Sequence, residues 1–193
     1  MKYPPLYILR HGQTVWNAEH RVQGRFDSPL TEKGREHARM QRKILESLDL
    51  SNFDAFSSPQ GRAFHTASIA LEGVFDRIHT DAALCEISAG DWDGFARRDL
   101  PLGGPLDETE ESALDLFERA PDGEGFAALR QRCESFLQRL KRPAVLVTHG
   151  VTSRMLRLVL TDRNASEIAM QEGGQGVVFH VENGRQRKLS IGA

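Results

Sequence analysis

The chain has 193 residues, a formal net charge of −2 at pH 7 and a sequence pI near 6.4. Lys and Arg are scattered among Asp and Glu, which argues against nucleic acid as a partner, and no run approaches the roughly 20 apolar residues of a membrane helix. The N-terminal residues carry no signal-peptide pattern, and the two cysteines, Cys85 and Cys133, have no metal-ligand spacing. We therefore predict a single cytoplasmic domain over residues 1–193, without a membrane partner.

A short apolar run at residues 6–9 stops abruptly at Arg10, His11 and Gly12. Such a run is typical of a central strand in a parallel sheet, and open α/β sheets bind ligands outside the carboxyl ends of their strands. Arginine offers a fork of donors that fits phosphate or carboxylate, and histidine can act as a nucleophile or a proton carrier. The pattern therefore predicts a buried strand that ends in a reactive, anion-binding loop.

The middle of the chain predicts a helix at residues 31–48, a strand at 53–57, a second helix at 60–71, a second strand at 78–84 and an ordered non-helical loop at 90–94. The second of these helices carries Arg62 in its first turn. Glu86 follows the end of the second strand. Both side chains are thereby predicted to lie at the same edge of the sheet as Arg10 and His11.

The rest of the chain predicts an exposed segment at residues 97–107, helices at 110–119 and 124–140, and a strand at 143–148. A helix at 151–160 and two hairpin strands at 176–182 and 185–191 follow. His149 and Gly150 follow the buried strand and repeat the opening pattern of strand, histidine and glycine. Asn183 and Gly184 form the dipeptide favoured in a two-residue hairpin turn. We predict a three-layer α/β/α sandwich with a mostly parallel sheet and one antiparallel edge strand.

Five blocks of sequence, in order, resemble the histidine phosphatase superfamily, whose members share the phosphoglycerate mutase-like fold. The first two blocks are Arg10-His11-Gly12 with Thr14, Trp16 and Asn17, and Gln23-Gly24 with residues 27–31 and Gly34. The other three are residues 57–59 with Arg62, Ala63, Thr66 and Ala67, then Glu86 with residues 90–94, and Thr148-His149-Gly150. The resemblance covers roughly residues 6–160.

The resemblance implies a phosphoryl-transfer site. In it, His11 is the nucleophile that carries the phosphoryl group, and Glu86 gives a proton to the leaving group and later takes one from water. Arg10, Arg62 and His149 hold the phosphoryl oxygens, where charge spreads in the transition state.

The resemblance also implies that four further residues line the phosphate or substrate site, namely Asn17, Gln23, Gly24 and Gly150. It implies no metal and no cofactor, because arginine and histidine supply the positive charge. Three positions depart from the family pattern: Gln13 replaces a frequent glutamate, Gln60 replaces a usual apolar residue, and Gly125 replaces a frequent serine.

We predict a metal-independent phosphomonoesterase of the phosphatase branch, which acts on a small phosphorylated metabolite. A phosphoglycerate mutase shares the whole pocket and is the nearest alternative, and a catalytically idle phospho-ligand docking module is a second. A metal site at His11 and His149 is disfavoured because the flanking arginines would repel a cation. For four further arginines a solvated surface is preferred over a role in guiding an anionic substrate, at Arg21, Arg25, Arg97 and Arg98. The sequence makes no prediction about the exact ester or the oligomeric state.

Overall fold

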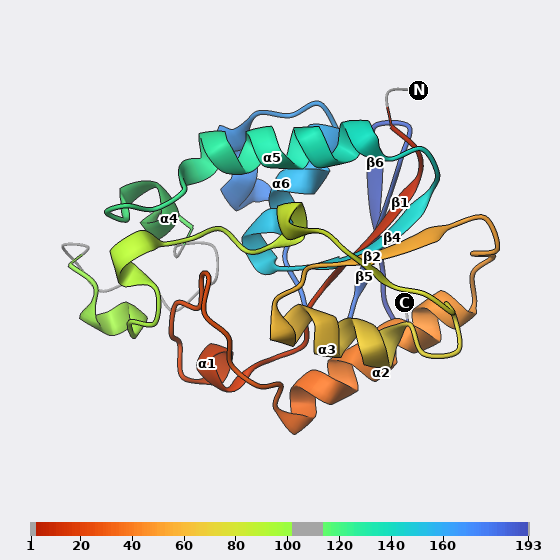
Figure 1. Ribbon diagram of the computed structural model, residues 1–193, viewed down its shortest axis with the longest axis horizontal. Coiled ribbons are helices and arrows are strands. Elements are labelled where there is room, and N and C mark those ends of the chain that lie inside the picture. Colours follow the sequence, from red (N-terminus) through yellow and green to blue (C-terminus); the bar gives the residue numbers. More distant parts are fainter. Residues whose placement is uncertain (1–2, 102–113, 193) are drawn as a thin grey trace.

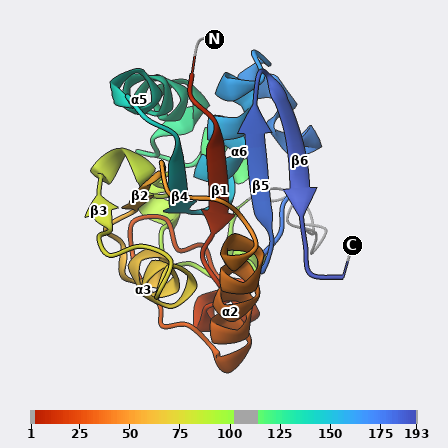
Figure 2. The ribbon, with the colours of Figure 1, turned by 90° about the vertical axis from the view of Figure 1, so that its right-hand side faces the viewer.

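The computed structural model describes residues 3–101 and 114–192 and contains a six-stranded sheet in the order β3-β2-β4-β1-β5-β6 (Figure 2). Its strands are β1 (Leu6–Arg10), β2 (Asp54–Ser57), β3 (His79–Thr80), β4 (Ala144–Thr148), β5 (Val178–Glu182) and β6 (Arg185–Leu189). The pairs β1–β4, β4–β2 and β2–β3 are parallel, while β5 runs antiparallel to both β1 and β6. This confirms the predicted mostly parallel sheet with an antiparallel edge.

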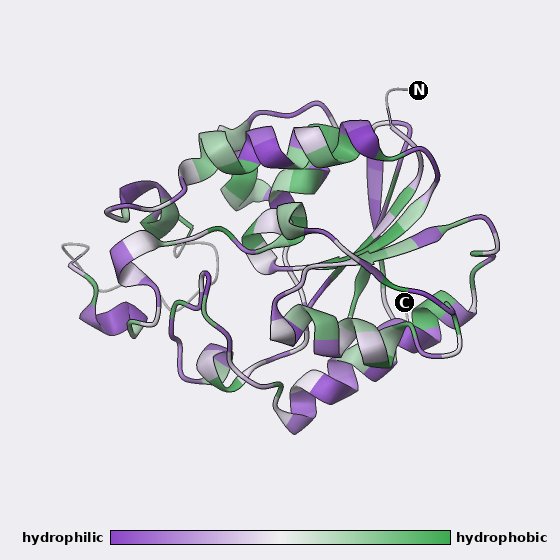
Figure 3. Ribbon diagram, viewed as in Figure 1, coloured by the Kyte–Doolittle hydropathy of each residue, from purple (hydrophilic) through white to green (hydrophobic). Residues whose placement is uncertain are grey.

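Two pairs of helices cover the two faces of the sheet (Figure 1). The helices α2 (Glu32–Glu46) and α3 (Gly61–Ala70) lie on one face, and α5 (Gly125–Arg139) and α6 (Gly150–Leu160) lie on the other. Figure 3 shows hydrophobic central strands and a hydrophilic edge strand β6, with helices that carry both hydrophobic and hydrophilic residues. The three-layer sandwich predicted from the sequence is therefore the fold of this chain.

Side chains of the central strands point alternately to the two faces of the sheet, and the core is therefore divided into two clusters. In β1, Leu6 and Ile8 pack into the cluster beneath α5 and α6, whereas Tyr7 and Leu9 pack into the cluster beneath α2 and α3. Every residue of β1 and β4 is buried. Because successive side chains of a strand point to opposite faces, a strand with helices on both faces is apolar along its length, and here only the last residues, Arg10 and Thr148, are strongly polar. The uninterrupted apolar runs that predicted these strands have this cause.

The register of β1 and β4 places their carboxyl ends side by side. Arg10 pairs with Thr148, and the His11 amide donates to the Thr148 carbonyl at 2.9 Å. The next residues of the two strands, His11 and His149, therefore leave the sheet together. Buried Gln41 of α2 donates to the Arg10 carbonyl at 2.9 Å and supports this edge from the other layer.

Helix α2 begins where the sequence predicted, because the Thr31 side chain accepts a hydrogen bond from the Gly34 amide. It ends at Glu46, two residues before the predicted end near residue 48. In α1 (Val15–Ala18), a short helix that the sequence did not predict, Thr14 caps the first turn by accepting from the Asn17 amide. The 3₁₀ turn Ala165–Met170 was also not predicted.

The strand predicted at residues 78–84 is wrong over most of its length. Only His79–Thr80 pairs with β2, and the chain then forms a 3₁₀ turn at Ala82–Leu84. The Asp81 side chain accepts from the Ala83 amide at 2.8 Å and so favours the turn over the extended chain. The loop at residues 90–94 likewise includes one 3₁₀ turn, Gly90–Trp92.

The exposed segment predicted at residues 97–107 and the helix predicted at 110–119 both fall partly on residues 102–113, outside the described residues. The described beginning of the segment is not fully exposed, because Leu100 is buried after the 3₁₀ turn Arg97–Asp99. The described end of the helix is α4 (Leu116–Arg119), with Leu116 and Phe117 buried. Within residues 3–101 and 114–192, no helix has the length and apolar character needed to cross a membrane.

Candidate active site

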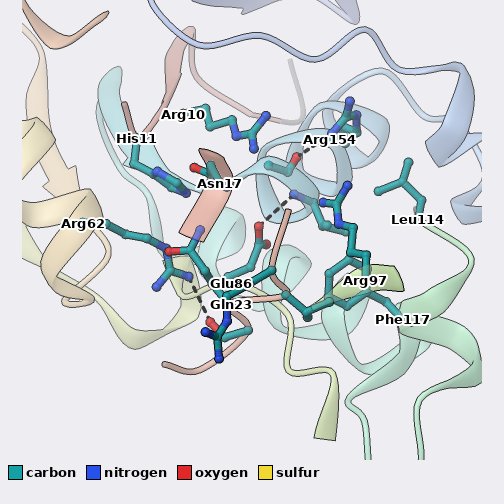
Figure 4. Close-up of a pocket in the computed structure, with 15 residues that line it drawn as sticks. Arg10, His11, Asn17, Gln23, Arg62, Glu86, Arg97, Leu114, Phe117 and Arg154 are labelled. Atoms are coloured by element: carbon teal, nitrogen blue, oxygen red, sulfur yellow. Dashed lines mark hydrogen bonds between the residues drawn. The ribbon is translucent and has the colours of Figure 1, made fainter. Parts of the chain in front are cut away.

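A cleft opens at the carboxyl ends of the parallel strands (Figure 4). It includes eight of the nine predicted site residues: Arg10, His11, Asn17, Gln23, Gly24, Arg62, Glu86 and Gly150. The ninth, His149, is fully buried and does not line the cleft, but its ring centroid lies 5.2 Å from that of His11. The fold thus brings together all the residues that the sequence singled out.

The His11 imidazole is oriented by its own backbone. Its Nδ1 lies 2.7 Å from the Gly12 carbonyl oxygen, which can only accept, so Nδ1 carries a proton. In the neutral ring, Nε2 then carries the lone pair, and Figure 4 shows the ring directed into the cleft. Burial and the charges of Arg62 and Arg10 hold the pKa of His11 well below its usual value. His11 is therefore neutral near pH 7, as a nitrogen nucleophile must be.

His149 is fully buried, and its Nε2 lies 2.8 Å from the Ser58 hydroxyl oxygen. Its Nδ1 is also buried and has no hydrogen-bond partner within the part of the chain that the structure describes. Burial, with the charge of Arg62, holds the pKa of His149 well below its usual value. This histidine is therefore a neutral group with one nitrogen bound to serine and the other without a partner among the described residues.

Arg62, 2% exposed, is held by the loop that contains Gly24. Its guanidinium donates to the carbonyls of Gly24 at 2.9 Å and Phe26 at 2.5 Å, and to Asp27 Oδ1 at 2.9 Å. Its Nε has no partner among the described residues. Burial lowers the pKa of this guanidinium, but arginine remains charged near neutral pH. A fixed cation with an unused donor therefore faces the anion that the cleft would bind.

Arg10 enters the cleft from the end of β1, beside the first residue of α6. A side-chain carbon added to Gly150 would lie 3.2 Å from Arg10 Nε, so the guanidinium packs against the helix start. Figure 4 shows the Arg10 and Arg62 side chains entering the cleft from two sides of His11. Two cationic groups therefore lie in the cleft beside the His11 ring.

Glu86 does not directly follow a strand, as the sequence predicted, but a 3₁₀ turn. Its carboxylate lies at the N-terminus of α6, where the amides of Val151 and Thr152 donate to it at 3.1 and 3.0 Å. The Ile87 amide donates to it as well, at 3.1 Å, and the Thr152 hydroxyl, which donates to the Cys85 carbonyl at 2.7 Å, lies 3.0 Å from it. Three backbone amides therefore fix the position of this carboxyl group at the edge of the cleft.

Asn17, Gln23 and Gly24 line the cleft from the loop around α1. Asn17 Oδ1 accepts from the Thr14 amide at 3.2 Å and from Gln175 Nε2 at 3.3 Å, which leaves its NH₂ group for a ligand. Gln23 is buried, and its Oε1 has no partner among the described residues. Gly24 has φ +46°, and a side-chain carbon there would collide with the carboxylate of Asp93 at 1.6 Å. The loop thus requires glycine at this position.

The structure adds residues that the sequence analysis missed or disfavoured. Arg21 and Arg97, for which a solvated surface was preferred, line the cleft together with Arg154. Arg21 donates twice to the Gly94 carbonyl, at 3.0 and 2.7 Å. The signal for Arg154 was its place on α6, one helical turn after Gly150 and on the same face.

Within the described residues, no group of three or more His, Cys, Asp or Glu side chains is placed to hold a metal ion. The cleft is instead lined by five arginines, namely Arg10, Arg21, Arg62, Arg97 and Arg154. Such a lining attracts anions and opposes cations. That the chain needs no metal or cofactor remains a prediction.

Comparison with known proteins agrees with this fold and cleft. The family model of the histidine phosphatase superfamily (branch 1) matches residues 6–190, and the chain belongs to this superfamily. This confirms the family and the phosphoglycerate mutase-like fold that the sequence blocks indicated.

Three similar proteins carry different activities in their names. A probable phosphoglycerate mutase, GpmB of Enterobacter sp. (strain 638), is 35% identical over 156 residues, which cover 76% of this chain and 69% of that protein. The alpha-ribazole phosphatase of Shigella flexneri is 26% identical and covers 98% of this chain and 96% of its own, with a TM-score of 0.79. The mycobacterial glucosyl-3-phosphoglycerate phosphatase, solved with VO₃, is 26% identical over 98% of this chain and 99% of its own, with a TM-score of 0.76.

Proposed function

We propose that this chain is a metal-independent phosphomonoester hydrolase that acts on a small phosphorylated metabolite through a phosphohistidine at His11. The observation that carries the proposal is the neutral His11 ring, whose Nδ1 is bound to the Gly12 carbonyl and whose Nε2 shares the cleft with Arg10 and Arg62. A nucleophile between two fixed cations is suited to attack an anion.

In the first step, the lone pair of His11 Nε2 attacks phosphorus and a nitrogen–phosphorus bond forms. The bond between phosphorus and the ester oxygen breaks, and that oxygen leaves with its electron pair. Glu86 is the candidate that protonates it, so its carboxyl group must hold a proton at this moment. This proton is the one that Glu86 takes from water in the second step of the preceding turnover.

Charge develops on the three equatorial oxygens of phosphorus during the transfer. Arg10 and Arg62 would contact them as cations, and Nδ1 of His149 as a neutral donor. Asn17 would add its NH₂ group, because its oxygen is already occupied by two donors. These groups are fixed before the substrate arrives, so little reorganisation is needed during the reaction.

In the second step, Glu86 is again a carboxylate and takes a proton from water. The water oxygen attacks phosphorus, the nitrogen–phosphorus bond breaks, and its electron pair returns to His11 Nε2. Inorganic phosphate then leaves. Two displacements at one histidine replace a single difficult attack by water.

Phosphoglycerate mutase is the second candidate function, because the GpmB proteins carry that name. The two activities differ in whether water or an alcohol receives the phosphoryl group. Glu86 and His149 are 63 positions apart (149 − 86), and we regard this connection as short for the substrate-enclosing insertion of a mutase. A docking module without catalysis would not need Glu86 beside a neutral nucleophile.

The proposal is tested by turnover of purified protein on a panel of phosphomonoesters, with isomerisation of 3-phosphoglycerate followed in parallel. We expect phosphate release that survives exhaustive chelation with EDTA and is lost by several orders of magnitude in His11→Ala. His65→Ala, at an exposed histidine of α3, is the matched control and should retain activity. Isomerisation faster than hydrolysis would favour the mutase, and no turnover of any ester would contradict both enzymes. Activity lost in EDTA and restored by a divalent metal would contradict the metal-free mechanism.

A further inference from the structure

Gln60, one of the three departures from the family pattern, connects two parts of the cleft through its side-chain amide. Its Oε1 accepts from the backbone amide of Glu86 at 2.7 Å, and its Nε2 donates to the Gly24 carbonyl at 2.9 Å. The residue lies at the N-terminus of α3 and is half-buried. Both ends of one amide are therefore used, on segments 26 and 36 positions away.

The Gly24 carbonyl that Gln60 contacts also accepts from Arg62 at 2.9 Å. The same oxygen thus links the Gln60 amide to the phosphate-binding guanidinium. On the other side, the Glu86 carboxylate is fixed by the first amides of α6. Gln60 supplies the bond that fixes the backbone of Glu86 relative to Arg62, which the contacts with α6 do not.

An amide side chain makes this pair of contacts without a charge. The Glu86 amide needs an acceptor and the Gly24 carbonyl needs a donor. The apolar residue that the family pattern usually carries at this position offers neither. The departure at Gln60 is therefore a feature of this chain rather than a general requirement of the fold.

We propose that Gln60 is a positioning residue for proton transfer, which sets the distance of the Glu86 carboxyl group from the ester oxygen. The inference rests on the proposed function, because it assumes that Glu86 is the proton carrier. A misplacement of about 1 Å is enough to reduce a positioned reaction by up to about 10²-fold. Loss of the Gln60 contacts should therefore slow the steps that need Glu86 and spare phosphate binding.

The test compares Gln60→Met, which keeps length and removes both hydrogen bonds, with wild type on an alkyl phosphate and an aryl phosphate. An acidic phenol leaves with little protonation, so only the alkyl ester depends strongly on Glu86. We expect the ratio of alkyl to aryl kcat/KM to fall about tenfold, while the inhibition constant of vanadate changes by less than about twofold. Gln138→Met, at an exposed position of α5, is the matched control and should leave the ratio unchanged.

A double-mutant cycle with Glu86→Gln shows whether Gln60 acts through Glu86. In the Glu86→Gln background, Gln60→Met should lower the ratio by less than about twofold, because the proton carrier is already absent. An equal effect in both backgrounds, or an unchanged ratio in a folded Gln60→Met protein, would overturn the positioning role. If Gln60→Met does not fold, Gln60→Leu supplies the same comparison.

Failure of this inference is distinct from failure of the proposed function. Wild-type protein that hydrolyses no ester would contradict the function itself. Wild-type hydrolysis with a strong leaving-group effect in Glu86→Gln, but none in Gln60→Met, would contradict only the role of Gln60.

Discussion

The hydroxyl oxygen of Ser58 lies 2.8 Å from Nε2 of the buried His149. The same oxygen accepts a hydrogen bond from the backbone amide of Gln60 at 3.2 Å. Its other contact is the Cys85 sulfur at 3.8 Å, which is a weak acceptor. The Ser58 hydroxyl therefore donates its proton in a hydrogen bond to His149 Nε2. In the neutral ring the imidazole proton then resides on Nδ1, the nitrogen that has no partner within the described residues. Ser58 would in this way make His149 a donor to a phosphoryl oxygen without a positive charge.

Ser58→Ala should weaken the binding of vanadate by about tenfold, because the His149 proton is no longer held on Nδ1. The measurement is the inhibition constant of vanadate, with the tautomer followed by ¹⁵N NMR of the histidine ring. Ser68→Ala, at an exposed serine of α3, is the control for loss of a hydroxyl. An unchanged inhibition constant in folded Ser58→Ala protein would show that the serine does not set the tautomer.

The low pKa values of His11 and His149 should make stability fall on the acid side of pH 6.5. Both groups are neutral in the folded state, whereas in the unfolded chain they bind protons below pH 6.5. Each therefore lowers the free energy of unfolding by up to about 1.4 kcal/mol per pH unit, between pH 6.5 and its folded pKa. Urea unfolding at pH 7.5 and 5.5 should show a smaller loss for His149→Asn than for wild type. Equal losses would mean that His149 is not held neutral.

Glu86→Gln should slow esters with poor alkoxide leaving groups by roughly 10²- to 10⁴-fold, the usual contribution of a positioned proton donor. The ester of an acidic phenol should suffer much less in its first step. Because the second step also needs Glu86, rapid mixing with an aryl phosphate should give a burst of phenol. Equal slowing of both esters, without a burst, would transfer attention to Asp91 or the buried Asp93 in the next loop.

Gly34 should be required for stability, because it lies where α2 packs against the loop after β1. A side-chain carbon there would lie 2.0 Å from the Gln13 carbonyl oxygen. Gly34→Ala should therefore lower the free energy of unfolding by about 2–3 kcal/mol. Lys43→Ala, on the exposed side of α2, should change it by less than about 0.5 kcal/mol. Denaturant titration of both variants measures these changes in the free energy of unfolding. A small change for Gly34→Ala would mean that the loop after β1 can move aside.

Much of the fold was predictable, because the strongest signals are local. The apolar runs of β1 and β4 predicted buried strands, and Arg10, His11 and His149 follow those runs directly in the chain. Once the strands are parallel, their carboxyl ends meet, and the pattern brings the three side chains to one edge. The antiparallel edge was equally local, since Asn183 and Gly184 form the turn of the hairpin.

The unpredicted features depend on contacts between distant segments or on weak local signals. The side-chain amide of Gln60 contacts Glu86, which is 26 positions away in the sequence. Glu86 contacts the first turn of α6, which is 65 positions away. Composition and periodicity carry no information about such pairs. The predicted length of β3 was wrong for a local reason, because the hydrogen bond of the Asp81 side chain competes with strand pairing. The strength of that hydrogen bond cannot be judged from residue types alone.

The central claim is that His11 Nε2 carries the phosphoryl group. The direct measurement is rapid mixing of Glu86→Gln protein with an aryl phosphate, an alkaline quench that preserves phosphohistidine, and location of the phosphoryl group by tandem mass spectrometry and ³¹P NMR. We expect one phosphorylated residue, His11, modified at Nε2, with its formation matching the burst of phenol. A phosphoryl group on another residue, or turnover of ester with no phosphoenzyme at any time, would contradict the account.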